Sequence, residues 1–213
     1  MKKLSVSILA TVAILLSSCS LDNDDENQGI IPGTEVTSQN LAGNLTTDLR
    51  LTSGIAHNLI GALLVKDGAT LTIDAGTRIN ALAGGTDVYI LVEKGGKIIA
   101  DGTADNPIVF TSNATNPQPG DWGGIILNGK APLSRQAGSE SNSAAEVNAA
   151  ILYGGAISED NSGILNYVKI EYTGARIDDE AEHNGLTLNA VGAGTVISNI
   201  AILNGDDDGI EFF

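Results

Sequence analysis

The sequence predicts an all-β fold, a parallel β-helix, because one strand-and-turn unit occurs twice near its end. Two sets of residues recur: Ile164, Val168 and Ile170 as Val196, Ile200 and Ile202 at an offset of 32, and Gly185, Leu186 and Leu188 as Gly209, Ile210 and Phe212 at an offset of 24. The offsets differ by 8 because residues 173–184 form a loop of 12 residues and residues 205–208 a loop of 4. Repeated strand-length pieces with a variable loop at one fixed place are typical of a solenoid.

The apolar residues of this unit follow the period of a strand. Apolar and polar residues alternate in the run Val168-Lys169-Ile170-Glu171, which is the period of two that a half-buried strand shows. The chain also has 26 glycines and only 4% aromatic residues, and glycine suits the tight turns between short strands. We therefore expect short strands whose apolar faces are buried only when coils stack.

Earlier coils are predicted by a second match. Residues 64–74 align with residues 91–101 at an offset of 27, and Gly68 and Gly95 mark the same turn in both. The β-helix is therefore expected to begin near Leu63 and to occupy residues 63–213. Residues 36–62 are expected to form an N-terminal cap, because the first coil of a solenoid would otherwise expose its apolar end.

Residues 1–18 have the pattern of a bacterial secretion signal. Lys2 and Lys3 precede an apolar run at residues 6–16, and small residues follow before Cys19. The run is too short to span a bilayer. The stretch Leu-Ser-Ser-Cys resembles a lipobox, which implies that Cys19 is lipidated and becomes the first residue of the mature chain. The alternative is an ordinary signal peptide followed by an unmodified cysteine. Cys19 is the only cysteine, so it has no disulfide partner in the chain under either interpretation.

Residues 19–35 are expected to form a disordered tether. Residues 20–29 are polar and acidic, with Asp22, Asp24, Asp25 and Glu26, and such a segment buries too little apolar surface to fold. The segment is either a solvated linker or a sorting signal. The acidic patch after the cysteine resembles the surface-export signal of Bacteroidetes lipoproteins, which implies an outer-membrane protein facing the extracellular side.

The charge of the chain excludes one class of partner. Formal net charge is −15, and removal of residues 1–18 takes away two lysines and leaves −17. Nucleic acid needs a basic face, so the sequence predicts no nucleic-acid binding. An acidic surface also gives no attraction to anionic lipid, so the predicted link to the membrane is the lipid on Cys19.

Four runs resemble a known family: GDWGGIILNGKAPLS, GILNYVKIEYTG, EHNGLTLNAVGAGT and NGDDDGIEFF. They are similar to a family of secreted or lipid-anchored right-handed parallel β-helix proteins, pectate-lyase-like solenoids common in Bacteroidetes. The resemblance covers most of residues 63–213 and implies the fold rather than an activity. Family members continue past the equivalent of GIEFF, so we expect the chain to be truncated at Phe213.

The two corner loops contain the candidate metal ligands. The carboxylates are Asp178, Asp179, Glu180 and Glu182 in the longer loop and Asp206, Asp207 and Asp208 in the shorter loop. Because consecutive coils stack about 4.8 Å apart, these side chains are expected at one edge. Oxygen-rich clusters suit Ca²⁺, which takes about 6–8 oxygen ligands. The sequence leaves two interpretations open, a calcium site and a set of solvated acidic turns.

Catalysis is the alternative to binding. Parallel β-helices include polysaccharide lyases and hydrolases, and Asp206, Asp207 and Asp208 resemble the paired aspartates of the hydrolases, in which two carboxylates act as acid and base. Arg176 is the one candidate base of a lyase. The Gly-His-Gly and Arg-Ile-Lys motifs of that hydrolase family are absent, and fold alone is weak ground for an activity.

Binding of an extracellular ligand is therefore the predicted function. The ligand is expected to be a glycan, and an outer-membrane transporter is a further candidate partner. Trp122, the only tryptophan, is either a platform that stacks on sugar or a side chain that packs over the flanking glycines. Residues 130–150 are expected to form a long loop that leaves the solenoid, and such loops often have functional roles.

The lipidation of Cys19 can be tested directly. We predict that Cys19→Ala releases the protein from membranes, because the acyl chains are the expected attachment. The measurement is fractionation of cells that express the full chain, with Cys19→Ala compared to wild type. Continued recovery of the variant with the membranes would contradict the prediction.

Overall fold

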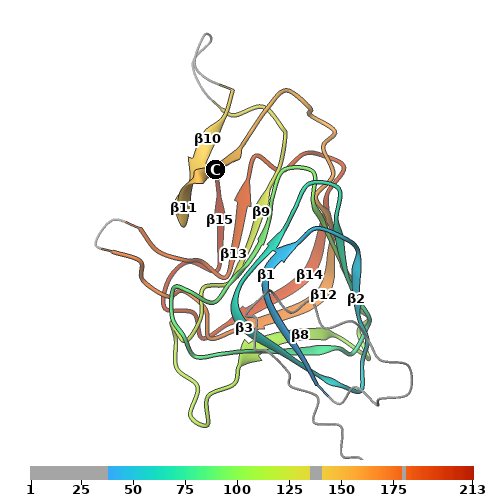
Figure 1. The fold of residues 1–213 in the computed structure, drawn as a ribbon, viewed down its shortest axis with the longest axis vertical. Coiled ribbons are helices and arrows are strands. Elements are labelled where there is room, and N and C mark those ends of the chain that lie inside the picture. Colours follow the sequence, from blue (N-terminus) through green and yellow to red (C-terminus); the bar gives the residue numbers. More distant parts are fainter. Residues whose placement is uncertain (1–37, 135–140, 179–180) are drawn as a thin grey trace, which may run out of the picture. The chain divides into compact units, whose positions relative to one another are not determined.

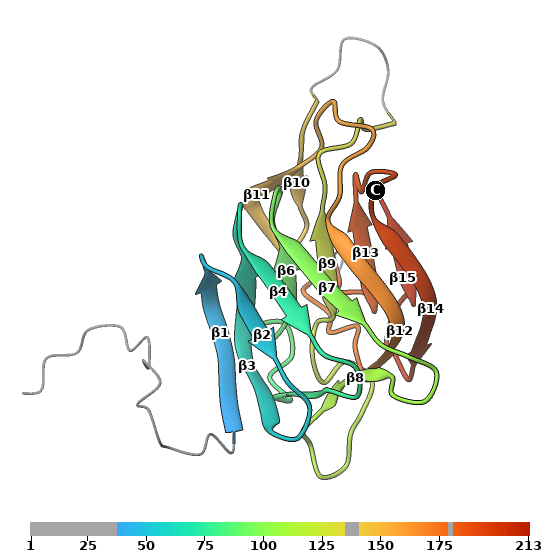
Figure 2. The same ribbon diagram turned by 90° about the vertical axis from the view of Figure 1, so that its right-hand side faces the viewer.

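The computed structural model describes residues 38–134, 141–178 and 181–213. Within them the chain forms a sheet of 13 mostly short strands that are paired in parallel, and a separate two-stranded antiparallel sheet. The strands stack coil upon coil as a parallel β-helix (Figures 1 and 2). Residues 1–37, which include the predicted signal segment and Cys19, lie outside the described residues. In the part that the structure describes, no helix is long and apolar enough to cross a membrane.

The pairing divides the strands of the helix among three faces. Face A consists of the first halves of β1 (Ser38–Leu45) and β3 (Ala56–Val65), β5 (Arg78–Ala81), β8 (Ile108–Ser112), and the second halves of β12 (Gly163–Glu171) and β14 (Val196–Leu203). Face B consists of the second halves of β1 and β3, then β6 (Ile90–Val92), β9 (Ile125–Asn128), β13 (Leu186–Asn189) and β15 (Ile210–Phe212). Face C consists of β2 (Leu49–Leu51), β4 (Thr70–Ile73), β7 (Lys97–Asp101), and the first halves of β12 and β14.

The register predicted from the repeats is the register of the structure. Ile164 pairs with Val196, and the offset of 32 continues to the end of β12 and β14. Leu186 pairs with Ile210 at the offset of 24, and Leu71 pairs with Ile98 at the offset of 27. Each match of apolar residues in the sequence is therefore a pair of neighbours in the stack.

The core is a column of apolar side chains that point inward from all three faces. Strands such as β4 and β7 alternate buried and less buried residues, as expected for strands with one face inside. The parallel strands already begin at Ser38, because β1 pairs with β3. The predicted boundary at Leu63 is therefore wrong, and most of the segment expected to be a cap, residues 36–62, forms coil strands. The cap was expected because the first coil of a solenoid would otherwise expose its apolar end.

Asparagines join neighbouring coils by side-chain hydrogen bonds. Asn199 donates from Nδ2 to Oδ1 of Asn166 over 2.8 Å, and Asn166 donates from Nδ2 to Asp101 over 2.8 Å. These two hydrogen bonds connect three successive coils, although neither asparagine side chain is buried. Because Asn199 lies at the corner between two faces with φ of 52°, its tolerance of left-handed backbone also suits it to this position.

The last coil exposes apolar side chains. These are Val196 and Leu203 of β14, Ile210 and Phe212 of β15, and the following Phe213. The expectation of further coils beyond Phe213 stays a prediction.

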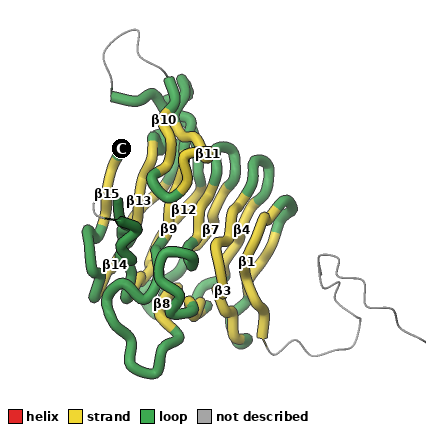
Figure 3. Tube along the Cα trace, turned by 60° about the vertical axis from the view of Figure 1, so that its left-hand side comes forward, coloured by secondary structure: helices red, strands yellow, loops and turns green. Residues whose placement is uncertain are grey.

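The chain between β9 and β12 forms secondary structure of its own. It contains a hairpin of β10 (Ser143–Ala145) and β11 (Asn148–Tyr153), paired antiparallel. Figure 3 shows this hairpin beside β9 and β13, on the outside of the coils. A small apolar cluster of Ala145, Tyr153 and Ala190 attaches it to the coil. The predicted loop at residues 130–150 therefore becomes, in part, a cover for face B.

Gly163 lies at a close contact between two neighbouring coils. A β-carbon on Gly163 would collide with the carbonyl oxygen of Ile98 in the neighbouring coil, and its φ is 122°. Gly68 has a φ of 84° but open space around it. We predict that Gly68→Ala costs about 1–2 kcal/mol of unfolding free energy from backbone strain alone, and that Gly163→Ala costs clearly more. Urea unfolding of both variants is the measurement, and equal losses would contradict the packing of β12 on β7.

Candidate functional site

The outer surface of face B presents side chains from five neighbouring strands in a row. Their register places Leu64, Leu91, Ile126, Thr187 and Glu211 one above the next. A second row runs beside the first and includes Lys66, Glu93, Asn128 and Asn189. The first row is apolar over β3, β6 and β9 and polar over β13 and β15. The outer surface of face B therefore changes from apolar to polar along the stack.

The hairpin covers the middle of these rows. Leu91 and Ile126 point away from the core yet are buried, and Asn128 is fully buried as well. Lys94 links the coils to the residues that flank the hairpin. Its Nζ donates to Oδ1 of Asn142 over 2.6 Å and to the carbonyl oxygen of Gly154 over 3.2 Å. The cover leaves an opening on each side, an open groove over β3 and β6 and a narrow pocket over β9 and β13.

The groove has a volume of about 530 Å³. It is bounded by Leu64, Lys66, Glu93 and Lys94 of the coils and by Asn148, Ala150, Ile151 and Leu152 of β11. Lys66 forms an ion pair with Glu93, so these two charges neutralise each other at the floor. The lining is thus mixed, with apolar side chains next to polar groups.

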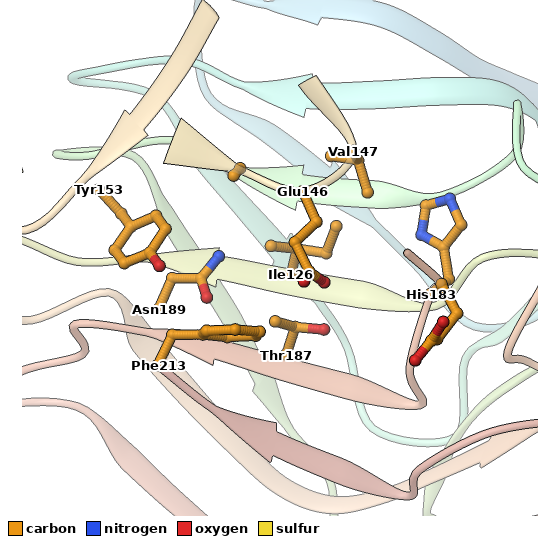
Figure 4. A pocket seen from close by; sticks show the side chains of 10 residues that line it. Ile126, Glu146, Val147, Tyr153, His183, Thr187, Asn189 and Phe213 are labelled. Carbon is orange, nitrogen blue, oxygen red and sulfur yellow. The ribbon is translucent and has the colours of Figure 1, made fainter. Parts of the chain in front are cut away.

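The pocket is much smaller, with about 10 Å³ of usable space, which is room for about one water molecule. Its lining is Ile126, Ala145, Glu146, Val147, Tyr153, Glu182, His183, Thr187, Asn189 and Phe213. Figure 4 shows Glu146 above the strands and Tyr153, Asn189 and Phe213 together at the opposite end from His183. Glu146 comes from the turn of the hairpin and Glu182 from the longer corner loop, so the two segments meet at this pocket.

His183 is one of three buried polar residues that line the pocket, with Thr187 and Asn189. Its Nε2 lies 3.1 Å from the carbonyl oxygen of Thr86, and its ring lies 5.1 Å from the ring of Tyr89. Burial lowers the pKa of His183, and the hydrogen bond to Thr86 opposes this only in part. The imidazole is therefore neutral at pH 7. Since a carbonyl oxygen can only accept, Nε2 carries the proton and Nδ1 is an acceptor.

Carboxylates gather at the mouth of the pocket. Burial, followed by the charges of Glu182 and Asp207, raises the pKa of Glu146. Burial, followed by the charges of Glu146, Asp208 and Glu182, raises the pKa of Glu211, although a hydrogen bond from Asn184 opposes the shift. These five carboxylates, Glu146, Glu182, Asp207, Asp208 and Glu211, are called the acidic corner below. Their mutual repulsion favours protonation or a bound cation.

The structure brings some of the sequence-predicted residues together. Glu182, Asp207 and Asp208 belong to the acidic corner. Asp178 instead accepts the backbone N–H of Ala181 over 2.9 Å and shapes its own loop, and Asp206 is exposed. Asp179 and Glu180 lie outside the described residues.

No metal centre forms in the described part of the chain. There, no group of three or more histidine, cysteine, aspartate or glutamate side chains is placed to hold a metal ion. Among the predicted calcium ligands, Glu182, Asp207 and Asp208 belong to the acidic corner, whereas Asp178 is engaged by its own backbone turn. Calcium binding stays a prediction, now without a preformed set of ligands among these residues.

The catalytic candidates are not assembled around a pocket. Arg176 is exposed and its segment pairs through the backbone with Glu182 as an isolated antiparallel bridge. Asp206, Asp207 and Asp208 do not line the pocket or the groove. The interpretation of Trp122 as a sugar platform is wrong, because its side chain is fully buried in the core and its Nε1 donates to the carbonyl oxygen of Glu171 over 2.8 Å.

Sequence reasoning missed Glu146, Glu211 and Asn189. Glu211 was findable, since the offset of 24 places it beside Thr187. Asn189 follows directly after Leu188, and its partner Asn128 stands at the matching position of the GIILNG run. Glu146 gave no such indication, because nothing in its segment marks where the hairpin folds back.

The chain belongs to the pectate-lyase-like β-helix family. The family described as a pectate-lyase like beta helix domain matches residues 43–213, which is most of the chain and nearly all of the coils described above. The fold predicted from the repeats is therefore confirmed by strand pairing and by family. No curated protein and no solved structure matches the chain.

The acidic corner predicts a pH dependence of stability. Because the folded-state pKa values of Glu146 and Glu211 are raised, the stability they contribute is present below the ordinary glutamate pKa and is lost as pH rises through the raised values. We predict that Glu146→Gln raises the melting temperature at pH 7 by about 1–3 °C, the size expected for an exposed charge in a domain of this length. The gain should shrink at pH 4.

Glu159→Gln is the matched control, since Glu159 is an exposed carboxylate outside the acidic corner. A similar gain for both variants, or a larger gain at pH 4 than at pH 7, would contradict the assignment of repulsion to the acidic corner.

Proposed function

We propose that this protein is a lipid-anchored cell-surface protein that binds an extracellular polysaccharide along face B without cleaving it. The observation that carries the proposal is the groove between β11 and strands β3 and β6. Its volume of about 530 Å³ lies in the range of small-molecule sites, about 300–1,000 Å³.

The lining of the groove suits sugar rings. A sugar has apolar C–H faces and hydroxyl groups around its edge. Leu64, Ile151 and Leu152 offer apolar contacts, while Lys66, Glu93 and Asn148 offer hydrogen-bonding groups. This mixture of an apolar surface with a few placed polar groups is typical of ligand sites.

The groove is also rigid, which lowers the entropy lost on binding. Its floor consists of paired strands of the central sheet. Its wall, β11, is held by pairing with β10 and by the apolar cluster around Tyr153. A preformed groove that runs over neighbouring strands of the stack suits an extended chain rather than a compact ligand.

Charge favours neutral over acidic polysaccharides. The chain has a formal charge of −15, which repels polyuronates at long range. Inside the groove Lys66 is already paired with Glu93, so it contributes little free positive charge. We therefore infer a preference for glycans without carboxylates.

The location of the protein rests on its N-terminal segment. The lipobox-like stretch before Cys19 and the acidic residues that follow support an outer-membrane anchor with the β-helix facing outward. An outer-membrane transporter that receives the captured glycan is a partner consistent with this location. The membership in a pectate-lyase-like family supports polysaccharide as the ligand class.

Polysaccharide cleavage is the second candidate function, and one observation favours it. Glu146 and Glu182 line the same pocket, and the pKa of Glu146 is raised, as a general acid requires. Against it stands the size of the pocket, which admits about one water molecule and leaves no place for a scissile bond between two rings.

Binding in the groove can be tested with two matched substitutions. We predict that Leu152→Asp weakens glycan binding by about tenfold or more, because it places a charge in the apolar part of the groove (~1.4 kcal/mol per tenfold). Ile157→Asp should leave binding unchanged. Both side chains are exposed, 46% for Leu152 and 53% for Ile157, and only Leu152 lines the groove. The measurement is calorimetric titration with the best ligand from a glycan array.

The cleavage alternative has its own measurement. Neutral glycans and polyuronates are incubated with the protein and Ca²⁺, and reducing ends and unsaturated products are followed. The proposal predicts neither product. Products that form with the wild type and are absent with Glu146→Gln, Asp207→Ala or Arg176→Ala would show that the protein is an enzyme. In the binding experiment, an equal loss of affinity in Leu152→Asp and Ile157→Asp would show that the groove is not the binding site.

A further inference from the structure

Three asparagines of the chain are followed directly by glycine, namely Asn128, Asn184 and Asn204. In such a pair the backbone nitrogen of the glycine can attack the side-chain carbonyl carbon of the asparagine, since glycine has no β-carbon that hinders the approach. The sequence alone does not distinguish the three pairs. The structure distinguishes them by burial and by the hydrogen bonds that hold each one.

Asn128 and Gly129 are held inside the stack of coils. The side chain of Asn128 is fully buried, and its Oδ1 accepts a hydrogen bond from Nδ2 of Asn189 over 2.9 Å. The N–H of Gly129, whose nitrogen would be the nucleophile, donates to the carbonyl oxygen of Asn189 over 2.8 Å. Attack within this pair therefore requires the two coils to separate locally.

Asn184 and Gly185 are restrained in the same two ways. Asn184 is 3% exposed, and its Nδ2 donates to Oε2 of Glu211. The N–H of Gly185 donates to the carbonyl oxygen of Asp208 over 2.9 Å. Both the nucleophile and the side chain that it would attack are therefore occupied by the next coil.

Asn204 and Gly205 lack these restraints. Both residues are exposed, at the corner where β14 ends and the shorter corner loop begins. Neither the side chain of Asn204 nor the peptide between the two residues forms a hydrogen bond with another described residue. The φ of Asn204 is 55°, a left-handed conformation that asparagine tolerates. Rotation of this peptide toward the side chain therefore breaks no hydrogen bond within the described part of the chain.

The free N–H of Gly205 is a property of this corner and does not come from the open edge of the last coil. Thr173 occupies the equivalent position one coil earlier, at the offset of 32 that relates β12 to β14. Thr173 is fully buried, yet its N–H donates no hydrogen bond to a described residue either. The backbone nitrogen at this corner is therefore left unbonded in the covered coil as well.

We propose that Asn204 is a site of spontaneous deamidation. The nitrogen of Gly205 forms a bond to Cγ of Asn204 and loses its proton, while the bond from Cγ to Nδ2 breaks and the side-chain nitrogen leaves as ammonia. The product is a five-membered succinimide. Water then opens this ring at either of its two carbonyl carbons, which gives aspartate or isoaspartate at position 204. The reaction needs no oxidant, reductant or enzyme.

The reaction changes the corner in two ways. Either product adds one negative charge to a loop that already contains Asp206, Asp207 and Asp208. Isoaspartate also lengthens the backbone by one carbon atom between β14 and β15, whose pairing with β12 and β13 fixes the span of that loop. Asn204 is thus a position where the chain can change charge and backbone length after it has folded.

The test measures deamidation at all three pairs in one sample. The full chain is incubated at pH 8, digested at successive times, and the peptides are quantified by mass spectrometry, in which deamidation adds one mass unit. We expect Asn204 to react at least about tenfold faster than Asn128 and Asn184, because those pairs must first break their hydrogen bonds. In urea, where the fold is lost, the three rates should converge.

Gly205→Ala is the matched variant. An added β-carbon would lie 3.2 Å from the carbonyl oxygen of Asp207 and 3.6 Å from Oγ1 of Thr173, so the corner accommodates it with a small shift. The variant should slow the reaction at Asn204 and leave the rates at Asn128 and Asn184 unchanged.

Two results would overturn the proposal. One is a folded protein in which Asn204 reacts no faster than Asn128 or Asn184, since the corner would then protect its own pair. The other is a rate difference that persists unchanged in urea, since the neighbouring residues and not the fold would then select Asn204.

Discussion

Register between coils is the constraint on which this structure depends. No coil buries its own apolar face, so each inward side chain needs its counterpart in the next coil, as Leu165 needs Ile197. Large inward side chains such as Leu71 and Ile98 are each worth about 1.5–3 kcal/mol when buried. Slippage by one residue would turn these side chains outward. The stack therefore fixes the outer rows of face B as firmly as it fixes the core.

Function follows from what the hairpin does to that face. Without β10 and β11, Leu91 and Ile126 would form an exposed apolar strip on the outside of the coils. With them, the strip is divided into a groove with mixed lining and a small pocket lined by apolar side chains, His183 and two glutamates. The hairpin also brings Glu146 beside Glu182, which joins a loop insertion to the acidic corner. The binding site is thus built where an irregular segment meets a regular surface.

The sequence predicts the regular part well and the irregular part poorly, for physical reasons. Repeats report pairing directly, because side chains that share an environment in successive coils, such as Leu186 and Ile210, are similar in type. The hairpin strands are short, and their turn at Glu146 lacks the Asn-Gly or Asp-Gly pair that marks a tight hairpin. Its docking on Tyr153 is decided by tertiary contacts. The acidic corner was therefore predicted with Glu182, Asp207 and Asp208 but without Glu146 and Glu211. For Trp122 the sequence left open both a sugar platform and packing over the flanking glycines, and the side chain is buried.

Hydrogen–deuterium exchange in the presence of a bound glycan tests the central claim, that face B beside the hairpin is the binding surface. The account predicts slower exchange in β11 and in the residues that follow β6, with face C strands such as β4 and β7 unchanged. Protection confined to face C, or to the exposed edge at β14 and β15, would contradict the account and place the ligand on another surface of the solenoid.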